Sequence, residues 1–486
     1  MFKKTKYTLI CLLAIMLTVL AFTACKSEHT PSDEPDDPSS SIQRPEENDP
    51  DHVHTTGDVV VEDKVEATCK SEGSYYEVLY CTECNKAISK KKVTTDKLSQ
   101  HTYANGTCTV CGETQKFSEG LAYEEVLGKC IVTGIGTCKD TDIVIPEEYN
   151  GKPVVGIGKE AFKENESIKS ITISKKISSI GSGAFYNCTE LIGIYIEDLA
   201  AWCNISFTDY SSNPLRYAKN LYLNGELITE LVIPDDVTSI CSYAFSGCNK
   251  LTSVEISNSV TSIGSYAFYE CTKLTSIDIP SSVTGIGNSA FNSCDGLTSI
   301  MIPDSVTSIG NYAFDYCYRL VEVINKSSLD ISVGSSYGSI AEYVKIVHTG
   351  DTLIKNVDDY LFITVDGVNY LVSYVGEDTE LVLPDNYNGE SYVINDYAFY
   401  DCAGLTSVII PDSVTSIGED AFRSCDGLTS VVIGNSVTSI GNSAFDWCDN
   451  LTAVGYTGTE EEWKKIGIGY SNYSLTSATI IYNYTE

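Results

Sequence analysis

A motif with a period of 23 residues recurs along most of this chain and limits the folds open to it. Between residues 237 and 323 it occurs four times, as VTSICSYAFSGCNKLTSVEI, VTSIGSYAFYECTKLTSIDI, VTGIGNSAFNSCDGLTSIMI and VTSIGNYAFDYCYRLVEV. Its Ala-Phe pair keeps the same step from Phe162 to Phe185, and again from Phe399 to Phe445. A fixed period between about 20 and 50 residues is typical of a solenoid built from stacked turns.

Each copy of the motif can be interpreted residue by residue. The alternation in Leu-Thr-Ser-Ile-Asp-Ile, which begins at Leu274, predicts a short strand with branched side chains inward and small polar side chains outward. Pro280 ends this strand because proline has no backbone N–H for the ladder. After it, Val283 and Ile286 start a second inward set, Gly287 permits a tight corner, and the Ala-Phe pair fills the interior.

A single copy cannot bury such an apolar face by itself. Stacked turns, separated by the roughly 4.8 Å between neighbouring strands, join their faces into one continuous core. The two ends of the stack would expose that core to water, so atypical sequences are expected there. The sequence therefore predicts a long β-rich solenoid with special caps.

The motif resembles that of the BspA-like leucine-rich repeat family of bacterial surface proteins, whose pattern is L-x-x-I-x-I-P-x-S-V-x-x-I-G-x-x-A-F-x-x-C. The resemblance extends from about Gly120 to the C-terminus. Nine units carry the Ala-Phe pair, at Phe162, Phe185, Phe245, Phe268, Phe291, Phe314, Phe399, Phe422 and Phe445. It implies a β-rich leucine-rich repeat fold at the cell surface and a role in adhesion to host matrix proteins or other cells. It assigns no individual binding residue.

The repeat is interrupted twice, because Phe185 and Phe245 are 60 residues apart and Phe314 and Phe399 are 85 apart. We expect the extra residues to form excursions from the solenoid. The predicted boundaries are an N-terminal cap at 116–153, repeats at 154–323 with an aromatic insertion at 197–231, an insertion with a second cap at 324–391, repeats at 392–454 and a C-terminal cap at 455–486.

Local signals refine two of these segments. The alternation around Asp366-Gly367 predicts a hairpin in the second insertion, and TELVLPDNYNGESYVIND there parallels TDIVIPEEYNGKPVVGIG in the N-terminal cap. The solenoid is therefore expected to stop and restart. In the C-terminal cap, Thr459 and Glu462 have the spacing of a capping box for a short helix that reaches Trp463.

Residues 1–24 are expected to be an export signal. Three lysines within the first six residues precede an apolar run, which ends in Phe-Thr-Ala before Cys25. Small residues before a cysteine resemble a lipobox, although Phe22 stands where leucine is usual. We expect Cys25 to carry a lipid that anchors the protein to the outside of the membrane; a plain signal peptide and a transmembrane anchor are the alternatives. Residues 25–55 are acidic and rich in Ser and Pro, which predicts an extended tether.

A zinc-ribbon-like, cysteine-rich module is predicted at residues 56–115. Two Cys-x-x-Cys pairs with a histidine between them have the spacing of a structural zinc site. The expected ligands are Cys69, Cys81, Cys84, His101, Cys108 and Cys111. The alternative is that the same cysteines form disulfides, since an exported chain meets an oxidising environment.

Charge and motif content argue against two classes of function. The chain has 66 acidic and 32 basic residues, a net charge of −34, which opposes binding to nucleic acid. No recurrent carboxylate pair, phosphate-binding loop or Ser/His/Asp set is visible, so we expect no enzyme activity. A cysteine recurs three residues after most of the phenylalanines; we interpret it as buried packing, with disulfides or a metal as the alternatives.

These observations predict a surface protein that binds an extracellular protein or glycan. Because large aromatic residues and arginine usually anchor interfaces, we expect the insertions to contribute more to binding than the Thr/Ser ribbon of the repeats, and replacement of residues 260–282 to weaken binding less than removal of either insertion. Packing of the insertions onto the solenoid is the alternative role for these residues. The candidates are Trp202, Tyr210, Arg216, Tyr217, Tyr360, Tyr370 and Tyr374. A structural spacer or glycan-capturing scaffold is the second function considered, and an enzyme site hidden in the insertions is the third.

Overall fold

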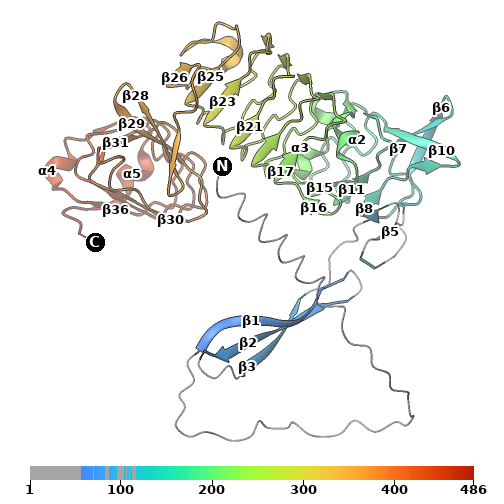
Figure 1. The fold of residues 1–486 in the computed structure, drawn as a ribbon, viewed down its shortest axis with the longest axis horizontal. Helices are drawn as coiled ribbons and strands as arrows, with labels where there is room; N and C mark the ends of the chain where they lie inside the picture. Colours follow the sequence, from blue (N-terminus) through green and yellow to red (C-terminus); the bar gives the residue numbers. More distant parts are fainter. Residues whose placement is uncertain are drawn as a thin grey trace, which may run out of the picture. The chain divides into compact units, whose positions relative to one another are not determined.

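The computed structural model describes residues 56–68, 71–82, 87–95, 103–104, 107–108, 110–111 and 117–485. From residue 117 onward the chain forms a solenoid, which confirms the predicted β-rich leucine-rich repeat fold. Figure 1 shows its short strands side by side along the chain, from β6 in cyan to β26 in orange. Before residue 117 there is a three-stranded sheet of β1 (Thr56–Val65), β2 (Gly73–Cys81) and β3 (Ala87–Thr95), and a small hairpin of β4 (Tyr103–Ala104) and β5 (Thr107–Cys108).

Two rows of parallel strands form the first solenoid segment, residues 122–348. The row that contains the Leu-x-x-Ile-x-Ile strands consists of β8 (Asp142–Val144), β11 (Ser170–Ile173), β13 (Gly193–Ile196), β15 (Leu221–Leu223), β17 (Glu230–Val232), β19 (Ser253–Glu255), β21 (Ser276–Asp278), β23 (Ser299–Ile302), β25 (Glu322–Asn325) and β26 (Ile346–His348). The row before the Ala-Phe turns consists of β7 (Lys129–Gly134), β10 (Lys152–Ile157), β12 (Ser179–Ile180), β14 (Ser206–Phe207), β18 (Ser239–Ile240), β20 (Ser262–Ile263), β22 (Gly285–Ile286) and β24 (Ser308–Ile309).

The second solenoid segment, residues 355–481, repeats this arrangement. One sheet contains β27 (Lys355–Val357), β28 (Tyr360–Val365), β29 (Val368–Tyr374), β31 (Tyr392–Ile394), β33 (Val414–Ile417), β35 (Ser439–Ile440) and β37 (Gly467–Ile468), and the other contains β30 (Glu380–Val382), β32 (Ser407–Ile410), β34 (Ser430–Ile433), β36 (Ala453–Tyr456) and β38 (Thr479–Ile481). Both segments begin with an antiparallel hairpin, whose second strand pairs in parallel with the first solenoid strand. The first hairpin is β6 (Ala122–Val126) with β7, and the second is β28 with β29.

The repeated phenylalanines form the centre of the core. Phe268, Phe291 and Phe314 are fully buried, and their neighbouring ring centroids are 5.4 and 5.2 Å apart. Parallel strands in register place each copy of a side chain above the previous one, as in the pairing of Val254 with Ile277. The 23-residue period therefore becomes a ladder of identical contacts.

The cysteine column lies in the same core, in agreement with the packing interpretation. The thiol of Cys294 donates a hydrogen bond to the carbonyl oxygen of Phe268 in the preceding turn, with sulfur and oxygen 3.2 Å apart. Cys271, Cys317, Cys425 and Cys448 make the same bond to the phenylalanine one turn earlier. Each thiol thus fills a small space and satisfies a buried carbonyl.

The first interruption is not an excursion, contrary to our expectation. β14 pairs in parallel with β12, and β15 pairs in parallel with β13, so residues 197–223 form one divergent turn of the solenoid. This turn contains α2 (Leu199–Cys203), the 3-10 turn η1 (Tyr210–Ser212) and α3 (Leu215–Ala218), and β16 (Glu226–Leu227) follows it. The turn lacks the Ala-Phe pair, so the repeat period could not reveal it.

The second interruption separates two hydrophobic cores. The first core extends from Leu121 to Val344 and the second from Tyr360 to Leu475. The sequence around Asp366 and Gly367 forms the predicted hairpin, in which both turn residues have a positive φ. Remaining elements are β9 (Glu148–Tyr149), η2 (Tyr337–Ser339), α4 (Glu460–Trp463) and α5 (Tyr473–Ser477). α4 has the predicted capping box between Thr459 and Glu462.

Candidate binding site

Trp202 is a core residue in this structure. Its side chain is 1% exposed, and its indole Nε1 donates a hydrogen bond to the carbonyl oxygen of Ala244 at 2.9 Å. α2 places it there because Asp198 caps the helix and directs Leu199 and Trp202 inward. Trp202 therefore joins the divergent turn to the next repeat and offers no surface to a ligand, which removes it from the candidates.

The other three candidates of the divergent turn lie together at the surface. The Arg216 guanidinium is 4.3 Å from the centroid of the Tyr210 ring and 5.6 Å from that of Tyr217. The Tyr217 hydroxyl accepts a hydrogen bond from the backbone N–H of Asn187 at 2.9 Å. All three side chains are half-buried. A cation held against two tyrosine rings combines the two residue types that most often dominate protein interfaces.

Tyrosines of the regular repeats extend this cluster, although they are not among the residues predicted from the sequence. The Tyr210 ring packs edge-on against Tyr269 with centroids 5.4 Å apart, while Tyr243 and Tyr266 stack at 5.1 Å. We call Tyr210, Arg216, Tyr217, Tyr243, Tyr266 and Tyr269 the Tyr210 patch. The recurrence of Tyr just before the Ala-Phe pair was the available signal, but the strand pattern points only to the outward Thr and Ser.

The backbone beneath these tyrosines favours other residues. Tyr243 and Tyr266 have φ angles of 68° and 57°, in the left-handed region that suits Gly, Asn and Asp. At the same place in other turns the residue is Ser289 or Asp420, also with a positive φ. A bulky residue in this conformation costs roughly 1 kcal/mol, so tyrosine is not there to stabilise the turn. The positive φ recurs along the array, so it is a property of the repeat, while the side chain at this position differs from turn to turn.

Two charged residues, Glu270 and Lys219, lie next to the Tyr210 patch and pair with each other. The Glu270 carboxylate accepts from the Tyr210 hydroxyl at 3.3 Å and from Lys219 Nζ at 3.4 Å. Burial, and next the Glu270 charge, raise the pKa of Tyr210 above its ordinary value. The Tyr210 phenol therefore remains a proton donor at neutral pH. Among the described residues, the Arg216 guanidinium packs against the Tyr210 and Tyr217 rings and forms no ion pair with a carboxylate.

The Thr/Ser ribbon offers fewer hydrogen-bond donors than its composition suggests. The Thr275 hydroxyl donates to the carbonyl oxygen of Thr252 in the preceding turn at 3.0 Å, and Thr429 does the same to Thr406. A second ladder runs through Thr261, Thr284 and Thr307. These hydroxyl protons stabilise the stack, so the threonines of the ribbon present methyl groups and hydroxyl acceptors to solvent.

The candidates of the second insertion do not form one site. Tyr360 is buried, and its hydroxyl donates a hydrogen bond to the carbonyl oxygen of Val382 in β30 at 3.0 Å. Because the side chain is buried, Tyr360 is excluded as a ligand-contact residue. Tyr370 lies under Lys345, whose Nζ is 5.4 Å from the ring centroid. Tyr374 donates to Asp378 at 3.1 Å. Tyr370 and Tyr374 remain partly exposed.

Tyr374 lines a cleft of about 710 Å³ in which Arg319 is also found. Arg319 belongs to the last regular turn of the first segment, and its Nε donates to the carbonyl oxygen of Tyr397 at 3.0 Å, while Nη2 donates to that of Tyr400. In the regular stack the carbonyl at the position of Tyr400 accepts from the preceding turn, as Tyr269 does from Gly247. Arg319 thus supplies a donor where the second segment has no preceding turn.

Asp295 lies near Arg319 and Asp401, and its carboxyl group is largely buried. Its Oδ1 is buried and accepts no hydrogen bond from the described residues. Burial raises its pKa to about 7, Arg319 opposes the rise, and Asp401 adds to it. The carboxylate form is therefore disfavoured in the folded protein.

Replacing Asp295 with asparagine is expected to stabilise the protein at alkaline pH. Because the folded-state pKa lies above the unfolded value near 3.9, wild-type stability is complete below about pH 4, falls as pH rises, and levels off above about pH 7. The amide introduced by Asp295→Asn cannot ionise, so the variant should gain about 2–4 kcal/mol at pH 8 and little at pH 4. Thermal unfolding at both pH values measures this. The matched control is Asp426→Asn, at the equivalent exposed position of a later turn; an equal gain there would contradict the argument.

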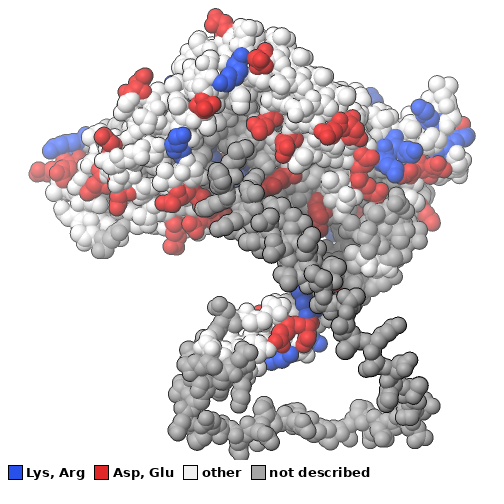
Figure 2. Space-filling model, viewed as in Figure 1, with Lys and Arg blue, Asp and Glu red and all other residues white. Residues whose placement is uncertain are grey.

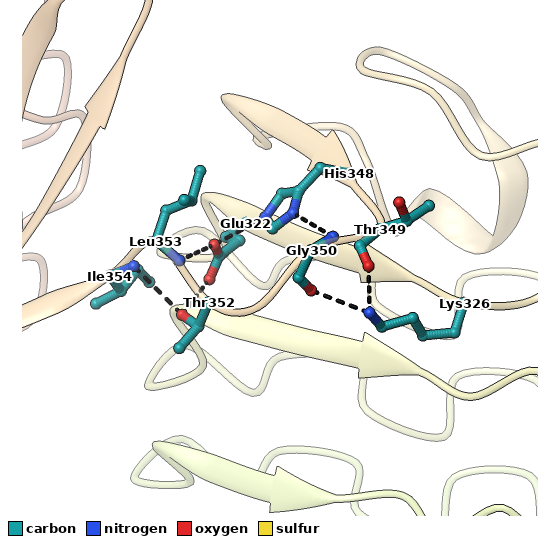
Figure 3. A network of polar contacts seen from close by, with 8 residues as sticks. All are labelled: Glu322, Lys326, His348, Thr349, Gly350, Thr352, Leu353 and Ile354. Atoms are coloured by element: carbon teal, nitrogen blue, oxygen red, sulfur yellow. Dashed lines mark hydrogen bonds and ion pairs between the residues drawn. The ribbon is translucent and has the colours of Figure 1, made fainter.

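A buried polar network ends the first segment, but its geometry is structural. Glu322 is fully buried and accepts from the Thr352 hydroxyl at 2.6 Å and from the Leu353 backbone N–H at 2.6 Å. Its third partner is His348, whose Nε2 is 3.0 Å away, while His348 Nδ1 accepts from the Gly350 N–H. Figure 3 shows these groups converging on one carboxylate.

This arrangement does not form a nucleophile activated by histidine. Because Nδ1 is an acceptor, the imidazole proton is on Nε2 and is donated to Glu322, and the Thr352 hydroxyl also donates to Glu322 in place of His348. Lys326 Nζ binds the carbonyl oxygens of Thr349 and Gly350 in the same loop. The network fixes the start of the connection between the two segments.

The lipid and zinc predictions fall mostly outside the described residues. Cys25, Cys69, Cys84 and His101 lie there, and of Cys108 only the strand is described. Cys81 is buried in β2 and Cys111 is partly buried. Within the described residues, no group of three or more potential metal ligands is found, and no helix is long and apolar enough to cross a membrane. Both assignments stay predictions.

Comparison with known proteins identifies the repeat. The family described as BspA type leucine rich repeat region matches residues 137–214, 216–337 and 380–486, in six copies. A search of curated proteins finds no match.

Three solved structures illustrate the similarity. A leucine rich cell surface protein from Faecalibacterium prausnitzii is 26% identical over 72% of this chain and 97% of its own, with a TM-score of 0.34. A leucine-rich repeat protein from Bacteroides ovatus is 23% identical over 75% and 98%, with a TM-score of 0.25. The pneumococcal vaccine antigen PcpA is 15% identical over 76% and 88%, with a TM-score of 0.24. On the family match, which covers more than half of its residues, the chain belongs to the BspA type leucine-rich repeat family.

Proposed function

We propose that this protein is exported to the bacterial surface and binds an extracellular protein through the Tyr210 patch. The observation that carries the proposal is the half-exposed Arg216, held between Tyr210 and Tyr217 and continuous with tyrosines of the next two repeats. Rigid tyrosine rings lose little conformational entropy on binding. The family and the export signal predicted at residues 1–24 support the surface location.

The charge of the molecule bears on the kind of ligand. Figure 2 shows Asp and Glu distributed over the visible face of the solenoid, with few Lys or Arg. A surface of this sign repels polyanions and attracts basic segments of a partner. We therefore propose a protein ligand with basic residues around its contact surface, and weaker binding at higher salt concentration.

The test uses the full chain, purified in mild detergent, against immobilised fibronectin, laminin, collagen and mucin in biolayer interferometry. The proposal expects saturable binding to at least one of these proteins, reduced when salt is raised from about 50 to about 500 mM, which shortens the Debye length severalfold. Absence of binding to all four, by protein whose thermal unfolding is cooperative, would count against adhesion to matrix proteins. Binding to mucin that depends on its glycans and not on the Tyr210 patch would favour the alternative of a glycan-capturing scaffold.

We also propose that Cys25 carries the lipid anchor. Cys25→Ser is expected to move the protein from the membrane fraction into the medium, or to leave the leader uncleaved, because lipid attachment requires the thiol. Metabolic labelling with a fatty acid measures this directly, and Cys11→Ser, within the leader, is the control. Lipid labelling that persists in Cys25→Ser would rule out this anchor.

We further propose structural zinc in the cysteine-rich module, on the spacing of its Cys-x-x-Cys pairs. Elemental analysis of the full chain is expected to find about one or two zinc ions, which a strong chelator removes. Disulfides at Cys81, Cys84, Cys108 and Cys111 in freshly secreted protein would decide for the alternative.

A further inference from the structure

The glycine three residues before the alanine of most Ala-Phe pairs marks where neighbouring turns come closest. A Cβ at Gly264, Gly287 or Gly310 would lie 2.4 to 2.5 Å from a backbone nitrogen of the preceding turn. The same holds at Gly418 and Gly441. A side chain therefore does not fit at this position when a regular turn precedes it.

Two turns have another residue at this position, Cys241 and Asn395, and in both the preceding element is not a regular turn. The backbone N–H of Asn395 donates to Leu371 in the hairpin strand β29. The backbone N–H of Cys241 donates to the carbonyl oxygen of Cys203, the last residue of α2, at 3.1 Å. Position 241 thus has space for a side chain, its residue is a cysteine, and its neighbour is a second cysteine.

The backbone distance suits a covalent bond between the two residues. This single N–H···O=C bond brings the backbones of Cys203 and Cys241 into direct contact. A disulfide requires roughly 4.4–6.8 Å between Cα atoms, so it needs residues whose backbones are in contact. The Cys241 charge is also among the influences on the pKa of the Cys203 thiol, which places the two thiols near each other. Cys203 is fully buried and Cys241 is partly buried, and both are thiols in this structure.

These two thiols also differ from those of the cysteine column. Thiols such as Cys271 and Cys294 donate to the phenylalanine carbonyl of the preceding turn. In the described part of the chain, neither Cys203 nor Cys241 makes a bond of that type. The packing role that explains the column therefore does not account for this pair.

We propose that Cys203 and Cys241 form a disulfide in the mature protein. The two thiols lose two protons and two electrons, and a sulfur–sulfur bond forms between them. The electrons reduce the disulfide of a thiol oxidoreductase, or of oxidised glutathione, to two thiols. The closed loop contains Tyr210, Arg216 and Tyr217, so the bond would hold half of the Tyr210 patch against the turn that carries Tyr243.

The thiols are poorly reactive once the protein has folded. Burial raises the pKa of Cys203 to about 12 and also raises the pKa of Cys241. The thiolate is the species that attacks a disulfide, so exchange is slow in the folded state. The bond is therefore expected to form while the chain folds, and afterwards to resist reductants.

The test is mass spectrometry of the full chain refolded in a mixture of reduced and oxidised glutathione. The protein is then unfolded in guanidinium with iodoacetamide and without reductant, and digested. The expected result is one peptide pair that joins Cys203 to Cys241 and is two hydrogens lighter than the separate peptides, with Cys271 and Cys294 alkylated. Recovery of Cys203 and Cys241 as alkylated peptides, or their linkage to other cysteines, overturns the proposal.

Thermal unfolding gives a second, independent readout. Cys203→Ala should unfold several degrees below wild type when both are refolded with oxidised glutathione, and the difference should shrink when both are refolded with dithiothreitol. The matched control is Cys271→Ala, a column thiol, whose difference from wild type should not depend on redox conditions. If the difference in unfolding temperature between Cys203→Ala and wild type is also the same under both redox conditions, the proposal is overturned. Neither measurement needs a ligand, so their outcome is separate from that of the binding test.

Discussion

Replacing Phe291 with alanine is expected to lower the free energy of unfolding of the first solenoid segment by about 3–5 kcal/mol. Phe291 is fully buried, and its ring stacks between those of Phe268 and Phe314, with centroids 5.4 and 5.2 Å away. The substitution removes contacts to both neighbouring turns and leaves a cavity, because parallel strands in register cannot close around one missing side chain.

The effect of Phe291→Ala should be local. Stability in a solenoid is approximately a sum over neighbouring turns, and the second segment has its own core. Hydrogen exchange is therefore expected to show lost protection around residues 260–320, with residues 392–454 unchanged. The control is Tyr312→Ala in the following turn, whose side chain is 61% exposed and whose loss should cost less than about 1 kcal/mol. A uniform loss of protection in both segments would show that the two cores unfold together.

The double substitution Tyr210→Ala with Arg216→Ala is expected to weaken ligand binding by about 30- to 1000-fold, the effect of removing roughly 2–4 kcal/mol at an interface hot spot. The double variant lacks both the guanidinium and the ring that packs against it, so the Tyr210 patch loses its centre, while the core residue Trp202 remains. Biolayer interferometry against the matrix protein that binds wild type measures the change, after circular dichroism has confirmed the fold.

The control for this prediction lies on the ribbon. Thr275→Ala removes an exposed hydroxyl that donates to Thr252, so it should alter stability slightly and binding less than about threefold. Loss of binding in Thr275→Ala with full binding in the double variant would move the ligand to the ribbon. The pair of variants therefore distinguishes which outer surface of the solenoid makes the contact.

The structure changes the comparison between insertions and repeats. Residues 260–282 contribute Tyr266 and Tyr269 to the Tyr210 patch, and residues 197–223 are a turn of the stack. Replacing the first stretch should therefore weaken binding, and deleting the second should disrupt the solenoid itself. Single side-chain substitutions can test binding without disrupting the fold, whereas these larger changes would alter binding and folding together.

Periodicity was sufficient to predict most of the fold. The inward positions Val283, Ile286, Ala290 and Phe291 are all buried as expected, because a strict 23-residue repeat allows one register in which every copy buries the same face. The capping box at Thr459 and the hairpin at Asp366-Gly367 were also predicted, since both depend on residues only a few positions apart.

Where the sequence departs from the 23-residue repeat, only the folded structure shows how the chain packs. Residues 197–223 continue the stack without the Ala-Phe pair, because Trp202 and α2 fill the core in another way. Tyr210 meets Tyr269 across 59 positions of sequence, and Cys241 meets Cys203 across 38, contacts that no local pattern encodes. Short-range alternation and sterics specify the repeating turn, so it can be predicted from the residues alone. Which turns become neighbours depends on long-range packing. That packing brings together the tyrosines and the arginine of the Tyr210 patch, and it brings Cys203 next to Cys241.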